Sequence, residues 1–152
     1  VHEGDTFDYA AETQEMVIFG SMNDNIIDLS IFNETVYARG GHDTFVYSSW
    51  SDARTDGVAA QDTIEGFAVG VGSGDRIDLQ HLLTYGGTDT LSDFIEVLGG
   101  DIDGGDVTIN IDKDGGSDFT TPDQIIVLTD VGSSTEAVTL DLLDDYNIIF
   151  VL

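Results

Sequence analysis

The sequence predicts a mainly all-β fold, in which a short parallel β-roll is followed by a β-rich C-terminal capping region with one or two short helices. Three observations predict it: an Asp- and Gly-rich composition, a nine-residue step in the apolar residues, and alternating apolar segments further along the chain. The chain has 152 residues, with 18 Gly, no Cys and 41% hydrophobic residues. That length and apolar content suit one folded unit, and Asp and Gly favour turns over helices.

The net charge excludes some partners and demands a counter-charge. Four basic and 30 acidic side chains give a formal net charge of −26. Nucleic acid and anionic lipid surfaces are therefore excluded as electrostatic partners. Because so many carboxylates repel each other in a compact domain, its stability requires either high salt or bound divalent metal. An acidic surface suited to a saline setting is the alternative interpretation.

Large apolar residues recur at a nine-residue step, at Ile18, Ile27, Val36 and Phe45. Polar residues stand two positions before the last three of them, at Asn25, Glu34 and Asp43. This is the phase of a G-G-x-G-x-D-x-U-x repeat, in which U is a large apolar residue. Residues 20–28 and 38–46 are the best copies, although Ala38 and Arg39 replace the first two glycines. About six residues of such a repeat form a turn and about three form a strand, so roughly eighteen complete one coil.

Turns that lie eighteen residues apart stack on the same edge of such a roll, so the two best copies predict a shared ion. Gly and Asn permit the positive φ that the turns need, and turn carbonyls with Asp side chains supply the oxygen ligands that calcium prefers. The residues expected to share one Ca²⁺ are Asn23, Asn25, Gly40, Gly41 and Asp43. Ordinary Asx and Gly turns in an all-β domain are the alternative.

A larger self-similarity extends the predicted roll. Residues 4–9 recur as residues 42–47, and residues 25–30 recur loosely as residues 75–80. We therefore expect degenerate coils over residues 1–80 and a β-rich cap over residues 81–152, as one continuous structural unit. The first residue is Val rather than Met, which suggests a fragment of a longer chain.

Further acidic residues are candidate calcium ligands. Asp62 stands nineteen residues after Asp43 and is expected to return to the same edge of the roll. Residues 112–118 place acids at alternating positions before Gly, which favours convergence on one hard cation, although the closing Glu of an EF-hand is missing. A solvated turn is equally compatible there, and residues 101–106 are a similar, weaker case. The candidates are Asp62, Asp75 from the recurrence at residues 75–80, Asp101, Asp103, Asp106, Asp112, Asp114 and Asp118.

The segments beyond residue 80 predict the elements of the cap. Residues 91–98 are apolar enough for a short helix or a buried strand, and periodicity does not decide between them. Residues 107–112 alternate as a half-buried strand does, whereas residues 124–128 read as a fully buried strand. The apolar end at residues 148–152 fits either a core strand or a terminal address.

Nothing in the sequence supports an enzyme. It contains no G-x-S-x-G, no H-E-x-x-H and no phosphate-binding G-x-x-x-x-G-K motif. His2, His42 and His81 fall in different predicted elements, where turn or surface positions are expected. Paired acids are abundant, so any chosen glycosidase-like pair is weak support for catalysis. No apolar run approaches the roughly 18 residues of a membrane helix.

Six motifs occur in order along residues 38–152, at residues 40–47, 62–67, 74–79, 82–83, 107–112 and 124–128. This ordered set closely resembles the C-terminal target domain of type I secreted RTX proteins, above all the version that ends very large bacterial adhesins. The ending of the chain is similar to the acidic-then-apolar tail of uncleaved type I secretion signals. The residues that match this tail are Asp144, Asp145, Ile148, Ile149, Phe150, Val151 and Leu152.

The resemblance implies export through an ABC transporter, a periplasmic adaptor and an outer-membrane channel, followed by calcium-driven folding outside the cell. It implies a secreted, cell-surface location as part of a larger adhesin, with Ca²⁺ as the cofactor, and we expect a monomer that does not span a membrane. Three alternatives stay open. The first is a calcium-dependent sugar- or protein-binding module, for which Trp50 and Tyr85 are candidate exposed aromatics. The second is a structural cap that only completes the roll. The third is the tail of a secreted RTX enzyme.

Overall fold

The computed structural model describes residues 5–48, 58–69, 74–83, 89–99, 105–116, 119–129, 131 and 149–150. One sheet contains β1 (Thr6–Asp8), β3 (Ile26–Leu29), β5 (Thr44–Tyr47), β7 (Arg76–Asp78) and β11 (Ile149–Phe150), in that order. The second sheet contains, in spatial order, β2 (Met16–Phe19), β4 (Glu34–Tyr37), β6 (Ala60–Glu65), β10 (Gln124–Thr129), β9 (Val107–Ile111) and β8 (Ile95–Gly99). One short helix, α1 (Leu91–Phe94), precedes β8 within these ranges. The mainly all-β prediction is confirmed.

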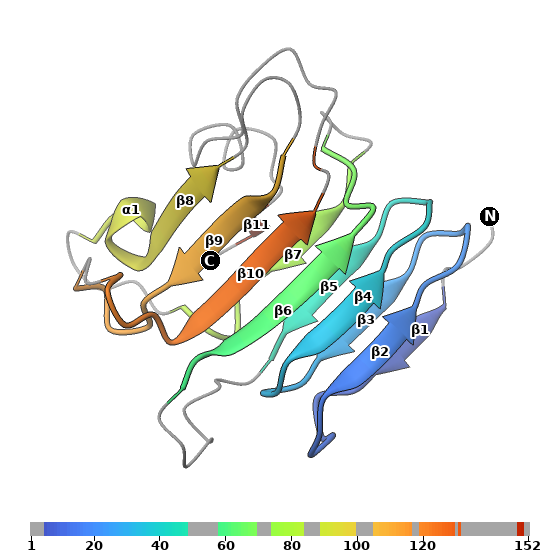
Figure 1. The fold of residues 1–152 in the computed structure, drawn as a ribbon, viewed down its shortest axis with the longest axis horizontal. Helices are drawn as coiled ribbons and strands as arrows, with labels where there is room; N and C mark the ends of the chain where they lie inside the picture. The colour runs from blue at the N-terminus through green and yellow to red at the C-terminus, as the bar shows by residue number, and fades with distance from the viewer. Residues whose placement is uncertain are drawn as a thin grey trace.

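Successive strands from β1 to β7 alternate between the two sheets, as in a roll, and neighbours within each sheet run parallel (Figure 1). The nine-residue step explains the alternation, because nine residues supply one strand and one turn to the opposite sheet. Its four apolar residues, Ile18, Ile27, Val36 and Phe45, are at most 2% exposed and join one core between the sheets. The repeated segments 4–9 and 42–47 provide β1 and β5 of the same sheet, as their similarity indicates.

The eighteen-residue spacing does not persist along the roll. Equivalent residues of β3 and β5 are 18 apart, but those of β4 and β6 are 28 apart and those of β5 and β7 are 32 apart. Asp62 therefore lies in β6 of the six-stranded sheet, whereas Asp75 is the residue that stacks on Asp43. The expectation that Asp62 returns to the edge of Asp43 is wrong, because the long connection between β5 and β6 delivers Asp62 to the opposite sheet.

The C-terminal segments extend both sheets of the roll. β10 pairs parallel to β6 and antiparallel to β9, which in turn pairs antiparallel to β8. β11 adds a parallel strand beside β7. Both sheets are therefore continued by residues that lie far along the chain. The domain boundary at residue 80 stays a prediction.

Segment 91–98 forms both elements that its composition allowed. Thr90 caps α1 because its backbone N–H donates to the Asp93 carboxylate at 2.7 Å, and the chain then extends into β8. β10 differs from the prediction of full burial, since Ile125 and Val127 face outward and are half-buried. Its six-stranded sheet is covered on the inner side and open on the outer side. Within the described residues, no helix is long and apolar enough to cross a membrane.

Candidate calcium-binding turns

Three polar residues stack at one edge of the five-stranded sheet. Asn25, Asp43 and Asp75 each stand directly before a strand, and the pairing of β3, β5 and β7 places them in register. All three are at most 2% exposed. Asn25 and Asp43 occupy the Asp position of the nine-residue pattern, whereas Asp75 lies outside its phase and belongs to the loose recurrence of residues 25–30 at residues 75–80.

Carboxylates join these turns into a hydrogen-bonded ladder. Asp43 Oδ1 accepts the backbone N–H of Asn25 at 2.8 Å, and Asp75 Oδ1 accepts that of Asp43 at 2.8 Å. Asp75 Oδ2 also accepts the N–H of Ala68 at 2.8 Å. Each aspartate therefore ties its own turn to the equivalent turn of the preceding coil.

Asp43 keeps one oxygen for another partner. Its Oδ2 is buried with no hydrogen-bond partner among the described residues, and Asp43 lines a cavity of about 190 Å³ with His42, Gly74 and Arg76. Burial, with the negative charges of Asp75 and Asp24 beside it, raises the pKa of Asp43 to about 7. A buried carboxylate whose charge is this poorly compensated is stabilised by a cation, so the residues present fit a hard metal ion such as Ca²⁺.

The glycine turns are in direct contact, as a shared ion requires. A Cβ at Gly41, whose φ is +106°, would lie 2.4 Å from the backbone carbon of Asn23, and the Gly40 N–H donates to the Ser21 carbonyl. The Asn25 side chain folds back instead, since its Oδ1 accepts the Ser21 N–H at 2.8 Å. The predicted residues are thus brought together, and their sharing of one ion stays a prediction.

Gly41→Ala is expected to lower the free energy of unfolding by about 2 kcal/mol, because the new methyl group meets backbone and φ is positive. Chemical denaturation in saturating calcium measures this change. Gly40→Ala is the matched control, since a Cβ there meets only the flexible end of Met22 at 3.3 Å. Equal losses in both variants would contradict the close stacking of the turns.

A second ladder occupies the six-stranded sheet, and sequence reasoning did not recognise it. Asp62 Oδ1 accepts a hydrogen bond from the Glu34 N–H at 2.9 Å, and Asp62 Oδ2 accepts one from Gln124 Nε2 at 3.1 Å. Ser30 Oγ donates to Glu34 Oε1. The available signal was the position of Glu34, two residues before the repeat residue Val36, whereas no periodicity pointed to Gln124.

The second ladder contains two buried carboxyl groups that lie close together. Glu34 and Asp62 are at most 1% exposed, and burial raises the pKa of both carboxyls, with their mutual interaction contributing for Asp62. Tyr47, from the opposite sheet, is also buried, and its pKa is raised well above the usual value by burial and by the charges of Asp62 and Glu34. The Tyr47 hydroxyl and Glu34 Oε2 have no hydrogen-bond partner among the described residues. This cluster is a costly place for two negative charges.

The acidic turn at residues 112–116 uses its first carboxylate locally. Asp112 Oδ1 accepts the Asp114 N–H at 2.9 Å and Oδ2 accepts the Gly116 N–H at 3.2 Å. Asp114 and Asp106 are exposed. Asp118 and the predicted ligands Asp101 and Asp103 lie outside the described residues, as do Asp144, Asp145, Ile148, Val151 and Leu152 of the predicted secretion signal.

Within the ranges that the structure describes, no three Asp, Glu, His or Cys side chains converge as a ligand set. An ion bound at these turns would therefore take much of its coordination from backbone carbonyls, as Ca²⁺ readily does. His42 and His81 are exposed, in keeping with the expected surface positions.

Parallel coils wound through stacked Asx and Gly turns, with buried carboxylates at those turns, define an RTX-type β-roll. A family model described as the C-terminal part of serralysins, peptidases of family M10, matches residues 9–120, and the chain belongs to this family. The family is that of RTX-type, calcium-binding regions of secreted proteins. A search of curated proteins finds no match. The predicted secretion signal lies beyond the matched residues.

Proposed function

We propose that the chain is the calcium-binding C-terminal RTX domain of a large secreted adhesin, that it carries the uncleaved type I secretion signal, and that it nucleates calcium-driven folding. The observation that carries the calcium step is the unpartnered, buried Oδ2 of Asp43 within the ladder of stacked turns. The net charge of −26 supports it independently, because compaction without cations is opposed by repulsion. The domain acts by binding and folding and has no catalytic role of its own.

Calcium is expected to raise the thermal stability of the domain, and magnesium at the same concentration to do so far less. With a Kd of about 10⁻⁴ M and about 1 mM ion, each site adds roughly 1.4 kcal/mol, so a few sites decide folding. Circular dichroism and melting in EGTA, in magnesium and along a calcium titration measure this. If the domain is as stable in EGTA as in calcium, the turns are held by hydrogen bonds alone, and the proposal is contradicted.

Export is tested separately from stability. The backbone of residues 149–150 forms β11 beside β7, so removal of the C-terminal segment also removes a strand. A passenger protein is therefore fused to residues 1–152 and to residues 1–146, with export and melting both measured. If the 1–146 fusion is no longer exported but keeps its melting temperature, the removed segment is a secretion signal. If the 1–146 fusion melts at a lower temperature but is exported as well as the 1–152 fusion, the removed segment is only a structural cap.

A second candidate is the tail of a secreted RTX enzyme, and the serralysin family match favours it. In that case the same calcium and export behaviour is expected here, and the catalytic part lies upstream in the complete protein. The sequence preceding this segment distinguishes the candidates: an H-E-x-x-H zinc motif supports the enzyme, and long arrays of β-sandwich repeats support the adhesin.

A further inference from the structure

The two outer faces of the roll differ in charge. On the five-stranded sheet one row of paired residues reads Asp8, Asp28, Val46 and Asp78. On the six-stranded sheet the central row has no charge across any strand: Val17, Thr35, Thr63, Val127, Thr108 and Leu98. An uncharged row across six strands is unexpected in a chain with a net charge of −26, and it is the kind of surface that a neutral partner can contact.

Beside this uncharged row, the face is hollowed where β2, β4, β6 and β10 begin, and two acids, Glu15 and the buried Glu34, are among the residues that line the hollows. One hollow of about 540 Å³ is lined by Val58, Gln61, Pro122 and Ile125, among others, and a second of about 420 Å³ lies over β2, β4 and β6. Asn33 and Gln61 line both, so the two hollows lie side by side, and together they are termed the groove. Volumes of this size are typical of small-ligand sites, which span about 300–1,000 Å³.

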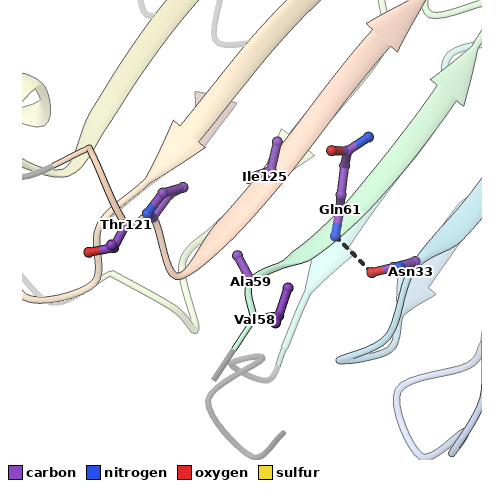
Figure 2. A pocket seen from close by; sticks show the side chains of 7 residues that line it. Asn33, Val58, Ala59, Gln61, Thr121 and Ile125 are labelled. Atoms are coloured by element: carbon purple, nitrogen blue, oxygen red, sulfur yellow. Dashed lines mark hydrogen bonds between the residues drawn. The ribbon is translucent and has the colours of Figure 1, made fainter. Parts of the chain in front are cut away.

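Neutral polar groups stand within the groove. Figure 2 shows Thr121 on one side and Asn33 and Gln61 on the other, with Val58 and Ala59 between them. Asn33 is held in place, because its Oδ1 accepts the Gln61 N–H at 3.0 Å and its Nδ2 donates to Glu15 at 3.1 Å. The exposed side chains of Gln61 and Thr121 make no hydrogen bond to another described residue, so they remain available to a ligand.

The surroundings of the groove disfavour other partners. No Lys or Arg is among the residues that line it, so an anionic ligand would meet only the repulsion of the acidic chain. β4, β6 and β10 each have strands paired on both sides, so a peptide could extend the sheet only at its edge strand β2, at one end of the groove. Amides, hydroxyls and short apolar side chains instead match an uncharged polyol, which presents hydroxyl groups beside C–H faces.

We propose that this groove binds a short neutral oligosaccharide, lying across β2, β4, β6 and β10 with the Gln61 amide as its main hydrogen-bonding group. Four adjacent strands span roughly 14 Å, enough for more than one sugar ring. The binding is independent of the metal turns, since Asn33 and Gln61 stand at the starts of strands in the six-stranded sheet. Failure of the calcium proposal would leave this one intact.

The test is a ¹H–¹⁵N correlation spectrum of the calcium-loaded domain, titrated to high millimolar concentration with maltotriose, cellotriose, chitotriose and, as the anionic probe, trigalacturonate. The expected result is a saturable shift of the Gln61 and Asn33 side-chain amide signals with at least one neutral trisaccharide and none with trigalacturonate. Gln61→Ala should weaken that affinity about five- to tenfold, which corresponds to the loss of a hydrogen bond.

Met22→Ala is the matched control, because Met22 is 77% exposed and lies outside the groove. This variant should bind the neutral trisaccharide with the affinity of the parent protein. Three results would overturn the proposal: no shift with any neutral trisaccharide, equal affinity in Gln61→Ala, or a shift with trigalacturonate alone. Broadening of the groove signals with protein concentration in the absence of sugar would assign the face to a second copy. A response to unstructured peptides but not to sugars would assign it to a protein partner.

Discussion

The calcium-free domain is expected to lose stability as the pH rises from about 4 to about 7. Burial raises the pKa of Asp43 from 3.8 to about 7, and it also raises the pKa of Asp75, Glu34 and Asp62. Because the folded-state pKa lies above the unfolded value, the folded state holds the proton more tightly. The stabilising contribution of the protonated carboxyls is fully present below the unfolded pKa and is lost as pH rises through the folded pKa. For Asp43 the interval corresponds to at most about 4 kcal/mol, reduced where solvent screens the charge. Urea denaturation in EGTA across this range measures the loss.

The Asp43→Asn variant tests whether the Asp43 carboxylate causes the loss of stability at rising pH. An amide at this position keeps the Oδ1 acceptor for the Asn25 N–H but carries no charge. The variant should therefore be more stable than the parent in EGTA near pH 8, show a flatter pH profile, and gain less from calcium. Glu12→Gln is the control, since it removes the same charge from an exposed position. A parent profile that is flat or rises with pH, or an unchanged calcium gain in Asp43→Asn, would contradict the assignment.

Asp62→Ala is expected to lower the free energy of unfolding by about 3 kcal/mol or more. Asp62 is fully buried, and its two oxygens accept from the Glu34 N–H and from the Gln124 side chain. Removing them leaves the Glu34 N–H buried without its acceptor and leaves Gln124 Nε2 only its longer bond to the Ile125 carbonyl, at 3.4 Å. It also opens space beside Tyr47. Chemical denaturation in saturating calcium measures the change, which should appear as a lower transition midpoint.

Asp62→Asn separates hydrogen bonding from charge. Asparagine retains an oxygen for the Glu34 N–H, and the Gln124 amide can turn to offer its own oxygen, so most of the bonding is kept. We expect a cost well below that of alanine, offset in part by removal of a buried negative charge. If the two substitutions destabilise equally, the neutral hydrogen bonds and the volume that asparagine retains contribute nothing, and only the charged carboxylate of Asp62 stabilises this site.

The repeat phase predicted the interior of the roll because it has a direct physical cause. A side chain must point inward once per strand, so Ile18, Ile27, Val36 and Phe45 follow a fixed step. The same phase located Asn25 and Asp43 at a turn, where they lie within hydrogen-bonding distance. Patterns that reflect burial at every coil survive in a single sequence even when the glycines have been replaced.

Connections of irregular length defeated the same reasoning at Asp62. Its spacing from Asp43 differs from the repeat by one residue, yet the intervening chain closes a longer coil and delivers Asp62 to the opposite sheet. The alternation within β10 was hidden for a different reason, since Ile125 and Val127 are apolar although they face outward. Local periodicity encodes neither the length of a coil nor which face of a strand is exposed when both of its faces are apolar. The groove on the six-stranded sheet also escaped prediction, because Asn33, Gln61 and Ile125 meet only through pairing.

The late strands have a consequence for the order in which the domain acquires its structure. β6 receives its second neighbour from residues 124–129 and β7 receives its own from residues 149–150. A chain that lacks those residues presents two parallel strand edges with unpaired backbone groups, which are templates for aggregation. Closing these distant pairings carries a loop entropy that only the assembled core repays, so folding is slow and cooperative with the end of the chain. Completion of the six-stranded sheet thus waits for residues 124–129 and that of the five-stranded sheet for residues 149–150, so these late pairings act as a kinetic checkpoint for the whole roll.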